Sequence, residues 1–196
     1  MGLTVRDLVY IGVFGSLWGA AEISLGSALH MLRAPFAGAI MAGAGMAIAL
    51  IGRLFVQKRG SILFIGMVTA TLKLFSIGGI ILSPLLGILL ESLLAESAVS
   101  ALGTNRTSFV LAGSLAATWT LLHPFLTMSL VAGHGLLTVY GWTLEKGART
   151  LGLDATAGLI VMSALIAAHG LWGATAGWVA WQAGRNVQER LRLTEA

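Results

Sequence analysis

The most constraining feature of this sequence is a series of apolar segments, each long enough to cross a lipid bilayer. The first runs from Leu8 to Leu29 and contains a single charged residue, Glu22. A helix needs about 20 mostly apolar residues to span the hydrocarbon core. Only 10% of the residues are charged, whereas soluble domains carry about 25%. The chain is therefore predicted to be an integral membrane protein, and we expect no nucleic-acid partner.

The N-terminal apolar segment is predicted to remain in the protein as a transmembrane helix. It is longer than the 7–15 residues of a signal-peptide core, and one Arg and one Asp precede it. The chain has no cysteine, which excludes disulfides, cysteine zinc sites and thiol catalysis.

The apolar segments predict an all-helical fold with six transmembrane helices in a single transmembrane domain, residues 1–196. The predicted spans cover residues 6–29, 36–56, 61–77, 84–102, 107–143 and 156–182, and a basic polar tail follows. The fifth span is too long for one straight crossing, and proline disrupts helix hydrogen bonding. We therefore expect a long fifth helix that is interrupted near Pro124.

The distribution of Lys and Arg predicts that both termini are cytoplasmic. With six spans, eight basic residues lie inside, three lie outside and Lys73 lies in the membrane, which accounts for all 12. Seven spans, with a break at Pro124, would give seven inside and four outside. The positive-inside rule favours six, in a multi-pass protein of the cell (inner) membrane. The eight predicted cytoplasmic residues are Arg6, Arg53, Lys58, Arg59, Arg106, Arg185, Arg190 and Arg192.

A stripe of small residues follows one side of the first predicted span. Small residues let another helix approach closely. Two interpretations remain open: an internal packing face, or a ridge that docks a partner subunit. The candidate docking residues are Gly12, Gly15, Ser16, Gly19 and Ala20.

Glu22 lies deep in a predicted span, and Lys73, Glu91 and Glu96 are further charged residues within predicted spans. Charges at this depth are costly and mark functional sites by default. Glu91 and Glu96 are five residues apart, so they point to different helix faces. We expect one of them to pair with Lys73 and the other to meet ligand or water; the alternative is a purely structural Lys–Glu pair.

Aromatic and histidine side chains complete the predicted substrate pocket. Trp rings and carboxylates together suit a small heteroaromatic or cationic ligand, because rings stack and attract cations. No zinc-hydrolase or nucleotide-binding motif occurs, so we expect no metal and no cofactor, although scattered histidines could converge on a metal or haem. The candidate substrate-binding residues are Trp18, Glu22, Glu91, Trp119, His123, His169 and Trp172.

The segment from Lys58 to Gly103 begins with a basic residue and glycine and ends in a helix with a Gly-x-x-x-Glu pattern. It resembles the corresponding region of the substrate-binding S components of energy-coupling factor (ECF) vitamin transporters, of the thiamin-precursor (hydroxymethylpyrimidine) type. The matching residues are Arg59, Gly60, Gly78, Gly79, Gly87 and Glu91.

The resemblance implies a protein that is not an enzyme. It implies high-affinity binding of a vitamin or vitamin precursor, and docking through the first helices on a transmembrane coupling subunit with two ATPases. Two other classes remain open. One is a small membrane enzyme acting on a lipid-like substrate, which would need Glu91 or Glu96 in a cavity beside a histidine. The other is a proton- or ion-coupled carrier that uses Glu22 and Lys73.

Overall fold

The computed structural model describes residues 2–32, 34, 36–75, 82–133, 135, 138, 141 and 157–194, and every regular element among them is helical. A π-helical turn, η1, interrupts the first helix. The elements are α1 (Val5–Ala21), η1 (Glu22–Gly26), α2 (Ser27–Met31), α3 (Ala37–Phe55), α4 (Ser61–Lys73), α5 (Leu82–Leu102), α6 (Arg106–Ala132) and α8 (Ala157–Thr194).

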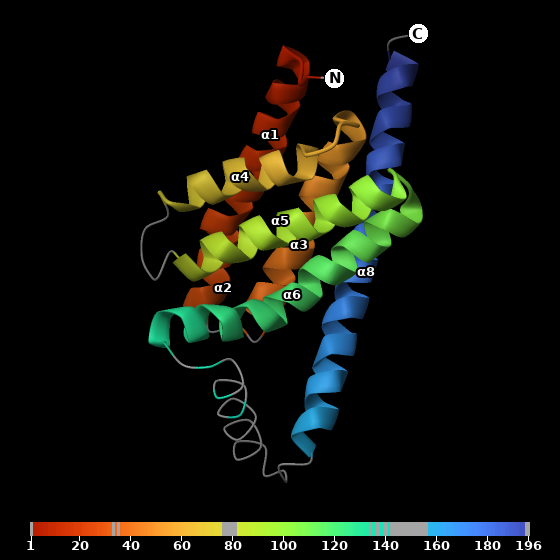
Figure 1. Cartoon of the computed structure of the whole chain (residues 1–196). Helices are drawn as coiled ribbons and strands as arrows, with labels where there is room; N and C mark the ends of the chain where they lie inside the picture. Colours follow the sequence, from red (N-terminus) through yellow and green to blue (C-terminus); the bar gives the residue numbers. More distant parts are fainter. Residues whose placement is uncertain are drawn as a thin grey trace.

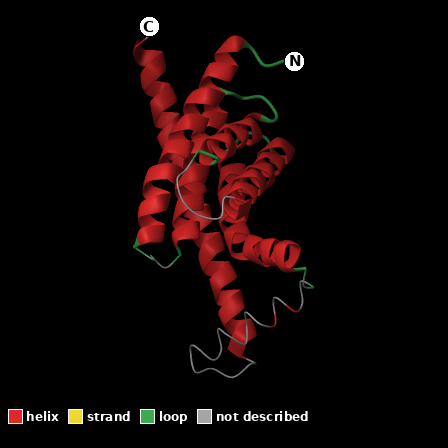
Figure 2. Ribbon diagram, turned by 90° about the vertical axis from the view of Figure 1, so that its left-hand side faces the viewer, coloured by secondary structure: helices red, strands yellow, loops and turns green. Residues whose placement is uncertain are grey.

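The helices form two layers that cross each other. Figure 1 shows α1, α3 and α8 side by side in one layer, while α4, α5 and α6 cross them as a second layer. Contacts between the layers join α4 to α1, and α6 to both α3 and α8. The start of α1 and the end of α8 lie at the same end of the molecule in both views (Figures 1 and 2).

Local sequence signals explain where the helices begin. Thr4 caps α1 through a capping box in which its hydroxyl accepts from the Asp7 backbone N–H at 3.3 Å and Asp7 accepts from the Thr4 backbone N–H at 2.7 Å. Asn105 caps α6 in the same way with Ser108. These reciprocal bonds satisfy backbone donors that a helix start leaves open.

Four helices in the described part of the chain are long and apolar enough to cross a bilayer, which is typical of a membrane protein. They are Val5–Leu29, Ala37–Phe55, Ser83–Leu102 and Ala157–Leu191. The shorter α4 has 13 residues, about 20 Å of helix, which is less than the hydrocarbon thickness.

The helices α3 and α5 agree closely in position with the predicted spans 36–56 and 84–102. The predicted third span, 61–77, begins where α4 begins, but α4 ends at Lys73 and residues 76 and 77 lie outside the described residues.

The prediction of an interruption near Pro124 is wrong, because α6 is continuous from Arg106 to Ala132. Proline is tolerated inside membrane helices when neighbouring groups compensate for the lost backbone hydrogen bond. The helix ends instead at Gly133, whose φ of 68° is a left-handed conformation that suits glycine. Most of the predicted span beyond Gly133 lies outside the described residues.

The last helix extends past the predicted end at residue 182, through the polar tail to Thr194. Two contacts stabilise this extension. The Gln188 side chain donates to the Leu54 carbonyl of α3 at 2.6 Å, and Arg185 pairs with Glu189 one turn later at 3.6 Å. Charge pairs at this spacing support helix in a polar sequence.

The helices α6 and α8 approach each other backbone to backbone through glycines. A Cβ atom built on Gly113 would lie 2.1 Å from the Gly173 carbonyl oxygen, and one on Gly177 would lie 2.1 Å from the Phe109 carbonyl oxygen. Gly173 and Gly177 are four residues apart, the spacing that presents small residues on one helix face. The two backbones therefore touch directly.

We predict that Gly177→Ala destabilises the protein, because the added methyl collides with rigid backbone. Overpacking of this kind costs about 1–3 kcal/mol. The measurement is thermal unfolding in detergent. Gly12→Ala is the matched control, because a Cβ there meets nothing within 4 Å. Equal melting temperatures for the two variants would contradict the close α6–α8 contact.

Candidate functional site

A buried ion pair sits where the first helix changes its winding. Glu22 opens the π-helical turn η1 and is only 9% exposed. The Lys73 ammonium lies 3.3 Å from the Glu22 carboxylate and donates to the Glu22 carbonyl oxygen at 3.0 Å. Single π-helical turns inside α-helices occur frequently at functional sites. The pair joins the C-terminal part of the first helix to the C-terminal end of α4.

This pairing corrects the expectation that Lys73 pairs with Glu91 or Glu96. The helix α4 packs against α1, and its last residue, Lys73, reaches the turn at Glu22. A sequence shows which charges lie in apolar segments, but the partner depends on which helices are neighbours.

Glu91 lies in α5, buried to 6% exposure. A Cβ built on Gly87, one turn earlier, would lie 3.7 Å from Glu91 Oε1 and 3.6 Å from His123 Nε2. The Ser83 hydroxyl lies 3.4 Å from the same histidine nitrogen. The start of α5 and the second half of α6 thus bring a carboxylate, an imidazole and a hydroxyl together.

No hydrogen bond or ion pair joins Glu91 to another of the described residues. The Glu22 carboxylate is close enough to repel it, and the only cation paired in this region of the described chain is Lys73. We call Glu22, Lys73, Glu91 and His123 the intramembrane polar cluster. The Lys73 ammonium is paired with Glu22, which leaves the Glu91 carboxylate able to accept an additional cationic or hydrogen-donating group.

Two predicted pocket tryptophans lie one helical turn from this cluster. Trp18 precedes Glu22 by four residues, is fully buried, and lies against Gly45 of α3, where a Cβ would overlap its indole ring. Trp119 precedes His123 by four residues. Both indole N–H groups, and Nδ1 of His123, are buried without a hydrogen-bond partner among the described residues. Buried donors of this kind are uncommon and call for an explanation.

His169 and Trp172 lie elsewhere, between α8 and the start of α3. The Trp172 indole donates to the Ala39 carbonyl at 2.8 Å, and His169 Nδ1 lies 2.8 Å from the Leu165 carbonyl. No described contact joins them to the polar cluster. They border an apolar cavity of about 220 Å³ that is lined by Phe36, Ala39, Ile40, Leu165, Ala168, His169 and Trp172.

The small-residue stripe divides into an inner and an outer part. Gly15 and Gly19 are buried, and Cβ atoms there would lie 2.6 Å from Val68 and 2.7 Å from Leu72 of α4. The docking prediction is therefore corrected for these two, since α4 already covers them. Ser16 and Ala20 are exposed and Gly12 is half-buried with open space beside it.

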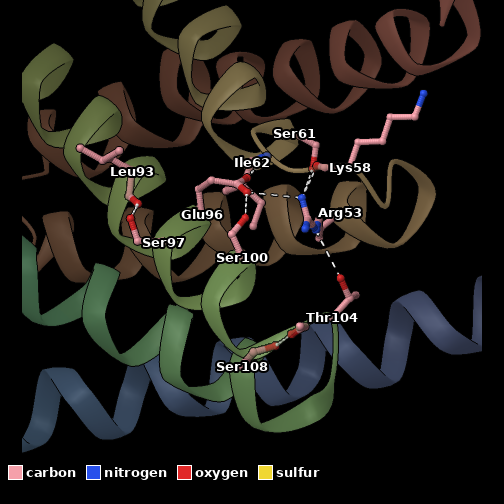
Figure 3. Close-up of polar contacts among 11 residues, drawn as sticks. Arg53, Lys58, Ser61, Ile62, Leu93, Glu96, Ser97, Ser100, Thr104 and Ser108 are labelled. Atoms are coloured by element: carbon pink, nitrogen blue, oxygen red, sulfur yellow. Dashed lines mark hydrogen bonds and ion pairs between the residues drawn. The ribbon is translucent and has the colours of Figure 1, made fainter. Parts of the chain in front are cut away.

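A second buried ion pair ties together α3, α4 and α5 (Figure 3). The Arg53 guanidinium lies 3.4 Å from Glu96, with the two side chains 5% and 9% exposed. Arg53 also donates to Ser61 at 3.1 Å, and the Ile62 backbone N–H donates to Glu96 at 2.9 Å. Further bonds come from Ser100, Thr104 and the Lys58 carbonyl.

The positive-inside rule predicts Arg53 as a cytoplasmic charge, and no sequence pattern predicts its pairing with Glu96. The sequence contains one sign that Arg53 is buried: Leu54 and Phe55 follow it, so it lies inside the apolar segment. Both charges are surrounded by hydrogen-bond partners, which is the condition under which a buried pair is tolerated. We therefore interpret this pair as structural and the polar cluster around Glu91 as the candidate binding site.

Neither a metal site nor a relative offers a further guide to function. Within the described residues, no group of three or more His, Asp or Glu side chains is placed to hold a metal ion. The chain matches no family model, no curated protein and no solved structure.

We predict that Glu96→Gln lowers the free energy of unfolding by about 3–5 kcal/mol, because it leaves Arg53 as an uncompensated buried charge. Chemical or thermal unfolding in detergent measures the change. Glu189→Gln is the control, since its exposed pair with Arg185 is worth about 0–1 kcal/mol. Equal losses in both variants would show that the Arg53 pair is not the buried constraint described here.

Proposed function

We propose that this protein is the membrane-embedded substrate-binding subunit of a micronutrient importer, energised by partner ATPases. The observation that carries the proposal is Glu91, a buried carboxylate without a partner in the described chain, beside the Glu22–Lys73 pair and His123. A carboxylate held at this depth with no structural bond is best explained by a ligand that supplies the missing charge or donor.

The chemistry of the cluster suggests the substrate class. One free carboxylate favours a cationic or hydrogen-donating group, and the ring of the nearby, half-buried Trp119 offers a flat apolar surface. Binding sites typically combine mostly apolar walls with a few polar groups that fix orientation. A small heteroaromatic cation, such as a vitamin or vitamin precursor, has both features.

We further propose six membrane crossings with cytoplasmic termini and a site toward the external side. Glu22 lies 17 residues after Val5 at the start of α1, about 25 Å along the helix. With the N-terminus inside, this depth brings the polar cluster toward the external face, from which an importer takes its substrate.

The proposed partners are a transmembrane coupling subunit and two ATPase subunits. The outer part of the small-residue stripe, Gly12, Ser16 and Ala20, remains open on α1 for the coupling subunit. Close helix approach over small residues is a common mode of association in membranes.

The substrate proposal predicts that Glu91→Gln weakens ligand binding while the fold is retained. Loss of a hydrogen bond to a charged group costs about 1.5–3 kcal/mol, which is about 10- to 150-fold in affinity. Titration calorimetry with thiamin and with its pyrimidine precursor, on wild type, Glu91→Gln and Glu22→Gln, measures the effect. Glu189→Gln, far from the cluster in sequence and exposed, is the control.

Unchanged affinity in Glu91→Gln would remove Glu91 from the site. No binding of either compound by the wild type would reject the thiamin-like substrate but not the importer class. The class is tested by affinity purification of the tagged protein from its native membrane, which should recover a coupling subunit and an ATPase pair. Recovery of this chain alone would contradict the importer.

A proton- or ion-coupled carrier is the second candidate. It is favoured because the polar cluster contains two carboxylates, Glu22 and Glu91, and one ammonium, Lys73. Two carboxylates and one ammonium could exchange a proton with a nearby imidazole as substrate moves. In this case the purified protein alone, reconstituted in vesicles, should transport and should acidify or alkalinise the lumen. The enzyme alternative needs Glu91 beside a histidine in a cavity, and His123 lies beside Glu91.

The topology proposal predicts cytoplasmic signals from reporter fusions placed after Arg106 and after Arg192. Both positions follow from the excess of basic residues on the proposed inner side. A fusion in the segment near Lys146 and Arg149, which the sequence predicts to be external, is the control. An external C-terminus would contradict the even number of crossings.

A further inference from the structure

An aromatic and basic seam joins the start of α6 to the later part of α8. The Arg106 guanidinium carbon lies 5.9 Å from the centroid of the Trp178 ring. Phe109, three residues later, packs edge-to-face on Trp181 with centroids 5.1 Å apart. The Arg185 guanidinium carbon lies 5.8 Å from the same Trp181 ring. Two guanidinium groups from different helices thus each lie over a tryptophan of α8, and these two tryptophans are three residues apart.

Both arginines remain open to the surroundings. Arg106 is exposed and forms no ion pair with another described residue. Arg185 has a side chain that is 53% exposed and one loose pair, with Glu189 at 3.6 Å. Such an exposed pair is worth little, so it does not prevent a stronger anion from binding.

The seam marks the depth at which α8 leaves the apolar region. The helix is apolar through Trp181 and then becomes polar, with Gln182, Arg185 and Asn186. Tryptophan is enriched at the boundary between hydrocarbon and headgroups, and Trp178 is 41% exposed. Leu171, seven residues earlier and therefore on the same side of α8, is 70% exposed.

We infer that this seam binds the headgroup of an anionic phospholipid, with the phosphate between Arg106 and Arg185 and an acyl chain along Trp178 and Leu171. Guanidinium groups match phosphate oxygens in charge and geometry. The apolar surface directly beside the two arginines fits a lipid tail, which a free anion does not possess. This inference depends on the membrane location of the chain and not on the proposed transport function.

The charges at this end of the molecule support an anionic ligand. Arg59 is also exposed there, whereas Lys58 is neutralised by Asp7 at 2.7 Å. The distribution of basic residues predicts that this end faces the cytoplasmic leaflet, where anionic lipids attract basic residues. Arg59 lies outside the seam, which makes it a matched control for charge alone.

The test is native mass spectrometry of the purified full chain, equilibrated with equal amounts of phosphatidylglycerol and phosphatidylcholine. The wild type should retain phosphatidylglycerol in preference. Arg106→Gln and Arg185→Gln should each reduce that preference about fivefold, and the double variant about 25-fold. Arg59→Gln should change it less than twofold, because general surface charge is not the cause.

Three outcomes would overturn the inference: equal retention of both lipids by the wild type, an equal loss in Arg59→Gln and Arg106→Gln, or displacement of phosphatidylglycerol by excess inorganic phosphate. The last outcome would identify a simple anion site rather than a lipid site. Melting temperatures of all variants are measured first. If Arg106→Gln does not fold, Arg185→Gln carries the comparison, since its side chain is more than half exposed.

Discussion

The constraint on which this structure depends is that a charge buried in an apolar helix bundle needs a partner. Among the described residues, two buried ion pairs satisfy it, Glu22 with Lys73 and Arg53 with Glu96. Each joins helices that are far apart in the sequence. Removing one partner of a buried pair is far more costly than removing an exposed one. These pairs therefore fix which helices are neighbours more strictly than apolar contacts, which lipid can replace.

The difference between the pairs separates structure from proposed function. Arg53 and Glu96 are surrounded by hydroxyl, carbonyl and backbone N–H partners, so nothing is left for a ligand to supply. The Glu22–Lys73 pair lies beside Glu91, whose carboxylate has no bond within the described chain. A polar group that lacks hydrogen-bond partners in an apolar interior lowers the stability of the fold. The presence of such a group at Glu91 is the physical basis of the binding-site proposal.

Packing between helices follows a different rule from charge. Apolar side chains gain little by leaving lipid for another helix, so close association relies on small residues and direct backbone contact. Gly113, Gly173 and Gly177 provide this between α6 and α8. Gly15 and Gly19 provide a similar surface for α4, which explains why the inner part of the small-residue stripe is covered within the chain.

The sequence by itself determined the helical class and the positions of α3 and α5, because the length of an apolar segment fixes where a helix can lie in hydrocarbon. It also identified Glu22, Glu91 and His123 as candidates, because ionisable groups stand out there. Only the tertiary structure decided that Lys73 pairs with Glu22, and that His169 and Trp172 lie apart from the polar cluster. Those outcomes depend on which helix faces meet, and no local pattern of residues records that.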